Sequence, residues 1–437
     1  MRPEQPANPD MTHTARPPYP RRAAGAVIHP IAAARSALTA VTAIVILLLT
    51  AACGSSGSAS GSAATRTPYD AAVLVAGATQ NTPVPTLSDT VRKNLTAIML
   101  AGRPVDVVKI SGEPQVLNPD DLGLETISGG TGTAAGNQAI TEDNLNAISQ
   151  VIASAPNADG ASYLEALMMA ADKAAARGAT SPYLVLIGSG LDDQGGLSFI
   201  PAGMLGADAA EVVSQLRAAG TLANPERLRG TTVVLSGFGY TAQDQAALTD
   251  VQRASEIRIW VACLEAVGAA VIVDPDPRTG PSVETDHTVI PVPVPDAVVV
   301  TSTATCTTEE YVFDGQSEVT FVANESVFVD PVAARSALDP LAAWLTAEPG
   351  RSAVIRGTTA NDGSPASDLV ATGSARAQGV ADYVVSLGVN PAQLTVVGVG
   401  SDFPEYVMPD RDPTTGALLA GPAVLNRSVR IALTDPC

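Results

Sequence analysis

Short apolar runs alternate with longer amphipathic segments between Tyr69 and Val273. The runs AAVLVAG, PVDVVKI, YLVLIGSG and TTVVLSGFG have the length and the apolar content of buried strands. Helical stretches such as ASYLEALMMAADKAAARG and ADAAEVVSQLRAAG lie between them. Strands that alternate with helices predict a doubly wound parallel sheet, so we expect residues 68–274 to form one α/β domain.

A proline-rich segment follows this domain. Residues 275–317 mix proline with polar residues and with alternating Val and Pro, which is typical of a semi-extended linker. Beyond it, the stretch from Val354 to Val384 has the pattern of a short strand, a glycine-containing loop and a long helix. We therefore expect a second, smaller domain at residues 318–437.

The composition narrows the classes of function. The formal net charge is -19, which disfavours binding to nucleic acid or to anionic lipid. The three histidines, His13, His29 and His287, all lie outside the two predicted domains. This removes Ser-His-Asp and Cys-His catalysis and most zinc sites. Paired carboxylates remain available for catalysis, but we expect a protein that is not an enzyme and needs no cofactor.

The N-terminal region indicates export. An uncharged apolar run extends from Ala37 to Ala52, shorter than the roughly 20 residues of a membrane-spanning helix. The sequence LLLTAACGSSGSASGSAAT resembles a bacterial lipobox, which implies cleavage before Cys53 and attachment of a diacylglyceryl group there. We expect a signal peptide at residues 1–52, a Gly/Ser-rich tether at residues 53–67, and a lipid anchor on the extracytoplasmic face of a bacterial membrane.

The middle domain resembles a von Willebrand factor A-type domain, with a plain Rossmann-like sheet as the alternative. The phrases GASYLEAL and LVLIGSGLDD are similar to two of that family's metal-loop segments. Ser162 stands where Thr is usual, Ser189 replaces a carboxylate, and the first loop, from Gly77 to Asn81, lacks its Asp. Hard divalent cations prefer several anionic oxygens, so we expect no metal here.

The C-terminal region resembles the OmpA-like peptidoglycan-binding domain. The segments VTFVANESVFVD, LDPLAAWLTAEPG, VIRGTTANDGS, SARAQGVADYVVSLGV, LTVVGVGSDFP and NRSVRIAL are similar to that family's motifs and follow its order. The resemblance implies an α+β fold of βαβαβ type, with helices on one side of a mixed sheet and VTFV in its first strand. It also implies binding of the diaminopimelate residue of peptidoglycan stem peptides.

That ligand presents one ammonium and one carboxylate, and the family resemblance assigns a group to each. An arginine suits the carboxylate, because a planar guanidinium matches it with two hydrogen bonds. Arg376 stands at the position of the family's helix arginine, on the inner edge of the predicted helix. Arg427, in the NRS segment, is a second candidate for the same carboxylate.

The partner of the ammonium is left open by the loop sequence. Thr359 begins the loop and is itself a candidate ligand-binding residue, and counting from the strand places Ala360 where the family has its Asp. Counting back from the helix arginine places Asn361 there, and Asp362 follows directly. The partner is therefore Asp362, the amide oxygen of Asn361, or neither. The last case would leave weak binding or none.

Three cysteines remain if Cys53 carries lipid. An oxidising compartment favours one disulfide and one free thiol. A bridge between Cys306 and Cys437 would join the two ends of the C-terminal domain, and the alternative pairs Cys263 with Cys306. The helix EIRIWVACLEAVG places Cys263 on its apolar face, which also fits a buried thiol.

These patterns favour an exported lipoprotein that binds peptidoglycan and tethers the membrane to the cell wall. The alternative is a structural adaptor with a degenerate OmpA-like domain, whose middle domain binds a protein partner. A third class, an enzyme that acts through carboxylates, has the least support.

Overall fold

The computed structural model describes residues 67–127, 132–300, 308–322 and 325–436. All of them belong to one compact unit, Ala63–Cys437. The predicted signal peptide, the lipidation site Cys53 and both members of the favoured disulfide, Cys306 and Cys437, lie outside the described residues. Cys263 is free and fully buried. No helix within the described ranges is long and apolar enough to cross a membrane.

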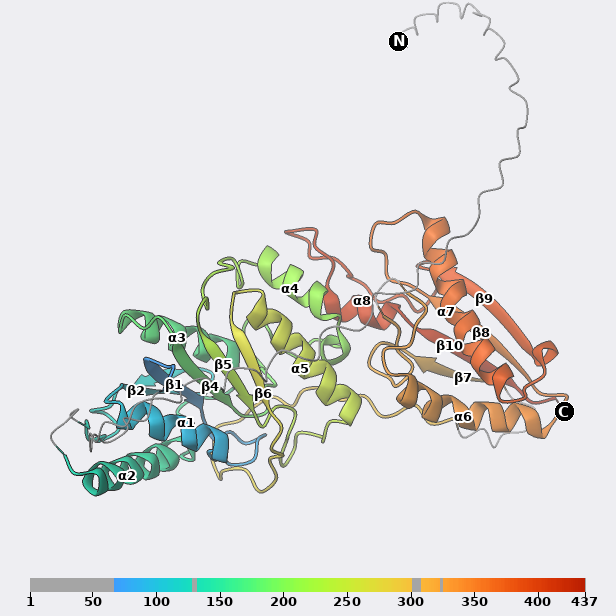
Figure 1. Ribbon diagram of the computed structural model, residues 1–437. Coiled ribbons are helices and arrows are strands. Elements are labelled where there is room, and N and C mark those ends of the chain that lie inside the picture. Colours follow the sequence, from blue (N-terminus) through green and yellow to red (C-terminus); the bar gives the residue numbers. More distant parts are fainter. Residues whose placement is uncertain (1–66, 128–131, 301–307, 323–324, 437) are drawn as a thin grey trace, which may run out of the picture. The chain divides into compact units, whose positions relative to one another are not determined.

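The middle domain is built on a six-stranded sheet with the order β3-β2-β1-β4-β5-β6 (Figure 1). All neighbouring strands run parallel except β3, which pairs antiparallel with β2. The predicted α/β architecture with a mainly parallel sheet is therefore confirmed. The strands are β1 (Ala71–Ala76), β2 (Val105–Lys109), β3 (Gln115–Leu117), β4 (Pro182–Ile187), β5 (Thr232–Ser236) and β6 (Ala270–Asp274).

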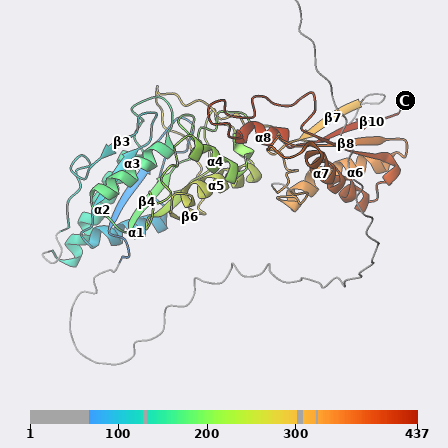
Figure 2. The ribbon, with the colours of Figure 1, turned by 90° about the horizontal axis from the view of Figure 1, so that it is seen from above.

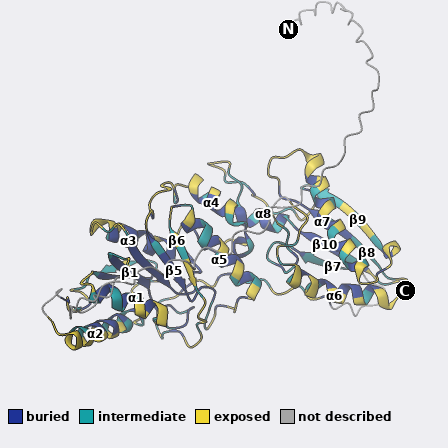
Figure 3. Cartoon of the chain, viewed as in Figure 1, coloured by how far each residue is buried: buried dark blue, intermediate teal, exposed yellow. Residues whose placement is uncertain are grey.

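Helices cover both faces of this sheet and bury two apolar clusters. Along β1, Val73 and Val75 join one cluster, whereas Ala72 and Leu74 join the other. A strand that is buried on both faces needs an uninterrupted apolar run, which explains the sequence pattern (Figure 3). The first cluster includes α3 (Tyr163–Ala176), η1 (Met204–Gly206), α4 (Ala209–Ala218) and α5 (Asp250–Glu265), and the second includes α1 (Asp89–Leu100) and α2 (Ala134–Ile152).

The proline-rich segment predicted as a linker instead contributes to both domains. Val289 and Val292 are buried in the core of the middle domain. The backbone N–H of Ile290 donates to Asp193 at 2.8 Å, and that of Val292 donates to Gln245 at 2.7 Å. Asp193 follows β4 and Gln245 follows β5, so this segment crosses the loops at the carboxyl ends of the parallel strands. Ligands usually bind to parallel α/β sheets at that edge.

The C-terminal domain contains a four-stranded mixed sheet with the order β7-β10-β8-β9. Strand β10 is antiparallel to β7 and β8, while β8 and β9 are parallel. The first strand is β7 and not the expected VTFV segment, where only an isolated bridge joins Phe321 to Phe328. Backbone pairing along β10 thus moves the start of the domain into the predicted linker. The strands are β7 (Thr308–Phe313), β8 (Ser352–Thr358), β9 (Leu394–Gly400) and β10 (Val429–Thr434).

Helices α6 (Pro331–Ala347) and α7 (Ala366–Ser386) pack on one face of this sheet (Figures 1 and 2). Leu338 and Leu341 of α6 share one buried cluster with Val380 and Val384 of α7. Apolar residues at intervals of three and four build these helix faces, as the sequence pattern indicates. The short helices η2 (Pro391–Gln393) and α8 (Ala420–Asn426) complete the domain.

Candidate functional site

The loop from Thr359 to Pro365 connects β8 to α7 and forms one wall of the candidate site. Helix and strand approach each other closely at two glycines. A Cβ atom on Gly357 would lie 1.8 Å from the carbonyl oxygen of Gly373, so neither position tolerates a side chain. Arg376 follows Gly373 by three residues, and this close packing therefore fixes where its side chain emerges.

Four of the five predicted ligand-binding residues line one cavity of about 180 Å³: Thr359, Asp362, Arg376 and Arg427. They come from the β8–α7 loop, from α7 and from the residue directly after α8. The fifth predicted residue, Asn361, does not line this cavity.

Arg376 is almost fully buried, with 3% of its surface exposed. Its Nε donates to the carbonyl oxygen of Glu325 at 3.1 Å, and its guanidinium lies 5.6 Å from the centre of the Phe321 ring. Burial lowers the pKa of Arg376 to about 10, and the nearby positive charge of Arg427 acts in the same direction. Arg376 remains charged at neutral pH, and no carboxylate among the described residues pairs with it.

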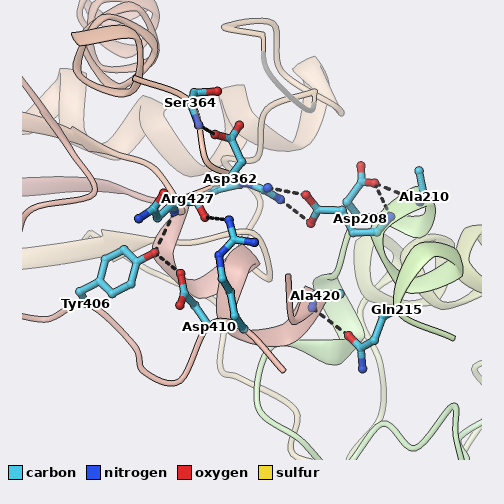
Figure 4. A network of polar contacts seen from close by, with 12 residues as sticks. Asp208, Ala210, Gln215, Asp362, Ser364, Tyr406, Asp410, Ala420 and Arg427 are labelled. Atoms are coloured by element: carbon cyan, nitrogen blue, oxygen red, sulfur yellow. Dashed lines mark hydrogen bonds and ion pairs between the residues drawn. The ribbon is translucent and has the colours of Figure 1, made fainter. Parts of the chain in front are cut away.

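Arg427 is also largely buried, but it already has a carboxylate partner. Its Nη1 and Nη2 donate to the two carboxylate oxygens of Glu211, at 2.7 and 2.5 Å (Figure 4). Burial alone would lower the pKa of Arg427, but the hydrogen bonds and charge of Glu211, with the charges of Asp208 and Asp362, raise it on balance. Glu211 belongs to α4 of the middle domain.

Asp362 supplies a carboxylate to the cavity. Its Oδ1 accepts a hydrogen bond from the backbone N–H of Ser364 at 2.9 Å (Figure 4). Burial alone would raise the pKa of Asp362, but hydrogen bonds from Ser364 and the charge of Arg427 lower it overall. The carboxylate is therefore ionised and can take a ligand ammonium.

Asn361 shapes the loop and does not face the ligand cavity. Its Oδ1 accepts from the N–H of Gly363 at 3.2 Å, and its own N–H donates to Tyr406 Oη at 2.8 Å. Its carbonyl oxygen accepts from Arg411 Nη2 at 2.8 Å. Asn361 is thus engaged on three sides by the protein itself. Of the two candidate ammonium partners in the sequence, only Asp362 has a side chain in the cavity.

Thr359 brings an unpaired hydroxyl to the same cavity. Its Oγ1 is buried and has no hydrogen-bond partner among the described residues. Its backbone N–H is paired with the carbonyl oxygen of Gly400 at 2.9 Å, so the backbone is held in place. A buried hydroxyl without a partner is costly, and a polar ligand group in the cavity would satisfy it.

Sequence reasoning missed Ser364 of the loop and two polar residues of the helix that also line the cavity, Asp368 and Thr372. The two helix residues are the more informative. Both belong to α7 and precede Arg376 by eight and four residues. Side chains four residues apart lie on the same face of a helix, so this spacing could have revealed them. With Asp362, Asp368 gives the cavity two carboxylates beside two guanidiniums. That combination complements a zwitterionic amino-acid head group.

At the carboxyl edge of the middle-domain sheet, polar side chains make hydrogen bonds within the protein itself. The carboxylate of Asp192 accepts from the N–H groups of Tyr163 and Leu164, at 2.5 and 3.1 Å, and so caps α3. Burial raises the pKa of Asp192 well above its ordinary value, although these hydrogen bonds oppose the shift. Ser189 Oγ lies 3.4 Å from Tyr163 Oη. The described residues contain no cluster of three or more histidine, cysteine or acidic side chains placed to hold a metal ion.

Comparison with known protein families matches residues 320–414 to the OmpA family. No curated protein matches the chain. Similar solved structures include the periplasmic domain of MotB, which is 16% identical over 29% of this chain and 64% of that chain, with a TM-score of 0.22. This chain thus covers less than two thirds of that domain.

Two further similar structures come from other cell-envelope proteins. The cell wall anchor of the T6SS from Pseudomonas aeruginosa is 19% identical over 29% of this chain and 82% of that chain, with a TM-score of 0.24. The peptidoglycan-associated lipoprotein from Burkholderia pseudomallei is 26% identical over 26% of this chain and 86% of that chain, with a TM-score of 0.20. These TM-scores are low, and the assignment rests on the family match. The C-terminal part of this chain contains an OmpA family domain.

Proposed function

We propose that this protein binds peptidoglycan non-covalently through its OmpA-like domain and tethers a bacterial membrane to the cell wall. The observation that carries the proposal is the polar cavity beside α7. There the buried Arg376, which pairs with no carboxylate in the described part of the chain, shares one lining with the ionised carboxylate of Asp362. The family resemblance implies diaminopimelate as the ligand, and this cavity offers a group for each of its charges.

In this proposal Arg376 binds the ligand carboxylate. Its Nε donates to the backbone carbonyl oxygen of Glu325, which leaves Nη1 and Nη2 for a paired interaction with two ligand oxygens. Asp362 binds the ligand ammonium, and Asp368 lies on the same lining to assist it. The hydroxyl of Thr359 supplies one more hydrogen bond. No catalytic role is assigned to these groups, because binding alone explains them.

The anchor belongs to the same proposal. Cys53 would carry a diacylglyceryl group after cleavage of residues 1–52, and residues 53–67 would give the folded unit reach from the membrane surface. The protein would then lie on the extracytoplasmic face, where peptidoglycan is accessible. One lipid-modified cysteine and one wall-binding domain are sufficient for a tether.

For the middle domain we propose a von Willebrand factor A-like fold that needs no metal. The strand order with one antiparallel edge strand, β3, supports this likeness. The lack of a carboxylate at Ser189 and the capping role of Asp192 argue against a divalent cation. Such a domain would serve as a surface for a protein partner.

A second function is favoured by one observation. Counted from the strand, Ala360 stands where the family has its carboxylate, and Arg427 is already paired with Glu211. Both features weaken the site, and a protein without wall binding would be an adaptor that acts through its middle domain. Cosedimentation of the full chain with purified diaminopimelate-type peptidoglycan separates the two functions. A tether sediments with the wall, and an adaptor stays in the supernatant.

A further inference from the structure

Glu211 and Arg427 meet in the geometry by which an arginine binds a ligand carboxylate. Both carboxylate oxygens accept from the two terminal nitrogens, at 2.7 and 2.5 Å (Figure 4). The side chains of Arg427 and Glu211 are only 14% and 23% exposed, so water screens this pair weakly. Paired hydrogen bonds of this kind are among the strongest that proteins make.

Arg427 also lines the ligand cavity together with Arg376 and Asp362. One guanidinium therefore belongs both to the proposed peptidoglycan site and to a contact with the middle domain. Its two terminal nitrogens cannot fork a ligand carboxylate while they fork Glu211. Arg376, by contrast, has no such competitor among the described residues.

The contact around this ion pair is closely packed. The backbone N–H of Ala420 donates to Gln215 of α4 at 3.0 Å (Figure 4), and Ala420 is buried in the core of the middle domain. A Cβ atom on Gly421 would lie 2.6 Å from the carbonyl oxygen of Ala202. Close backbone approach of this kind requires glycine and holds α8 in one position. Glu211 is thus presented to Arg427 by a fixed surface.

We propose that Arg427 joins Arg376 on the single ligand carboxylate, and that Glu211 substitutes for that carboxylate at Arg427, so that ligand binding at Arg427 and the Glu211–Arg427 contact exclude each other. This inference rests on the proposed function of the cavity. The middle domain then lowers the affinity of the wall-binding site, and a partner that engages α4 would raise it. By thermodynamic reciprocity, the ligand must weaken the Glu211 contact by the same factor.

Calorimetric titration of the full chain with free meso-diaminopimelate tests this directly. Glu211→Gln keeps the size of the side chain and removes its charge, and we expect it to bind about tenfold more tightly than wild type, a usual size for coupling between two sites. Glu211→Asp keeps the charge on a shorter side chain, and its affinity should lie between those of wild type and Glu211→Gln. Glu226→Gln is the control, because Glu226 pairs with Arg229 on an exposed surface and should leave the affinity unchanged.

Adding Arg427→Ala to Glu211→Gln should remove the gain in affinity. Hydrogen exchange gives a second measurement on the wild-type chain. Saturation with meso-diaminopimelate should speed exchange in the first turn of α4, around Glu211. Affinity that is equal in wild type and Glu211→Gln, together with unchanged exchange in α4, would overturn the inference.

These measurements distinguish a failure of the proposed peptidoglycan binding from a failure of the proposed competition by Glu211. If wild type binds, Arg376→Ala abolishes binding and Glu211→Gln changes nothing, the wall-binding function stands and only the competition by Glu211 is wrong. If neither wild type nor Glu211→Gln binds meso-diaminopimelate or intact wall, the proposed function itself is wrong, and the competition is wrong with it.

Discussion

The Nε of Arg376 donates a hydrogen bond to the backbone carbonyl oxygen of Glu325 at 3.1 Å. A lysine at this position has no second nitrogen with which to keep that bond while binding a ligand. The orientation of the guanidinium is therefore set by the segment that precedes α6, and its terminal nitrogens stay available. A lysine at residue 376 would therefore keep the positive charge but lose the fixed, planar guanidinium.

The first prediction compares the loss of the charge of residue 376 with the loss of its guanidinium geometry. Arg376→Ala should weaken cosedimentation with wall by roughly one to two decades, because a charge-assisted hydrogen bond is worth about 1.5–3 kcal/mol. Arg376→Lys should lose most of that affinity although it keeps the charge. Arg335→Ala, on the exposed face of α6, is the matched control. Wild-type affinity in Arg376→Lys would contradict a paired interaction.

Local sequence patterns define where Arg376 and Asp362 lie in the fold, and in the structure both line one cavity. A strand, a glycine-containing loop and an amphipathic helix place them within one β–α connection. The sequence left open whether Ala360 or Asn361 occupies the position of the family's Asp. Only the structure shows that the Oδ1 of Asn361 accepts from the N–H of Gly363 within the loop, while its backbone N–H and carbonyl oxygen pair with Tyr406 and Arg411.

Contacts between residues that are distant in the sequence were not predictable. The pairing of Arg427 with Glu211 joins residues 216 positions apart. Val292 was assigned to a linker because of the prolines around it, yet it is buried against loops that follow β4 and β5. Proline content indicates a lack of regular secondary structure, but it does not indicate a lack of packing.

The second prediction concerns the ammonium partner. Asp362→Asn should weaken wall binding about as much as Arg376→Ala, Asp368→Asn should have a smaller effect, and Asn361→Ala should act mainly through the loop. Titration calorimetry with meso-diaminopimelate ranks the three. An affinity in Asp362→Asn equal to that of wild type would transfer the role to Asp368.

The third prediction concerns the pH dependence of binding that arises from the Asp362 carboxylate. The pKa of Asp362 is lowered from its ordinary value of 3.8, so more than half of the carboxylate is still ionised at that pH. Its contribution to folding is present above the unfolded pKa and is lost as pH falls through the lower folded pKa. The decline of wall binding with falling pH should likewise have its midpoint below 3.8. A decline already complete above that pH would point to another group.

The fourth prediction concerns the anchor. Cys53→Ala should release the protein from membranes, because an apolar run from Ala37 to Ala52 is shorter than the roughly 20 residues that span a bilayer. Fractionation after an alkaline wash measures this. A Cys263→Ala variant serves as the control, since that thiol is buried in the middle domain and should not affect membrane attachment. Retention of Cys53→Ala in the washed membranes would disprove the lipid anchor.

The last prediction uses the unpaired hydroxyl of Thr359. Its Oγ1 is buried without a partner among the described residues, so replacement by the similarly shaped valine removes an unsatisfied group. Thr359→Val should therefore leave the free energy of unfolding unchanged or raise it by about 1 kcal/mol. The same change should weaken binding of meso-diaminopimelate several-fold, because a ligand hydrogen bond is lost.

Thr358→Val is the matched control for this measurement. Thr358 Oγ1 lies 2.8 Å both from the carbonyl oxygen of Asn426 and from Ser428 Oγ, away from the cavity lining. Its loss should destabilise the fold by about 1–3 kcal/mol, because buried partners are left unpaired. Opposite effects at two adjacent threonines would assign the Thr359 hydroxyl to the ligand. Equal destabilisation by both substitutions, with binding unaffected, would show that Thr359 has only a structural role.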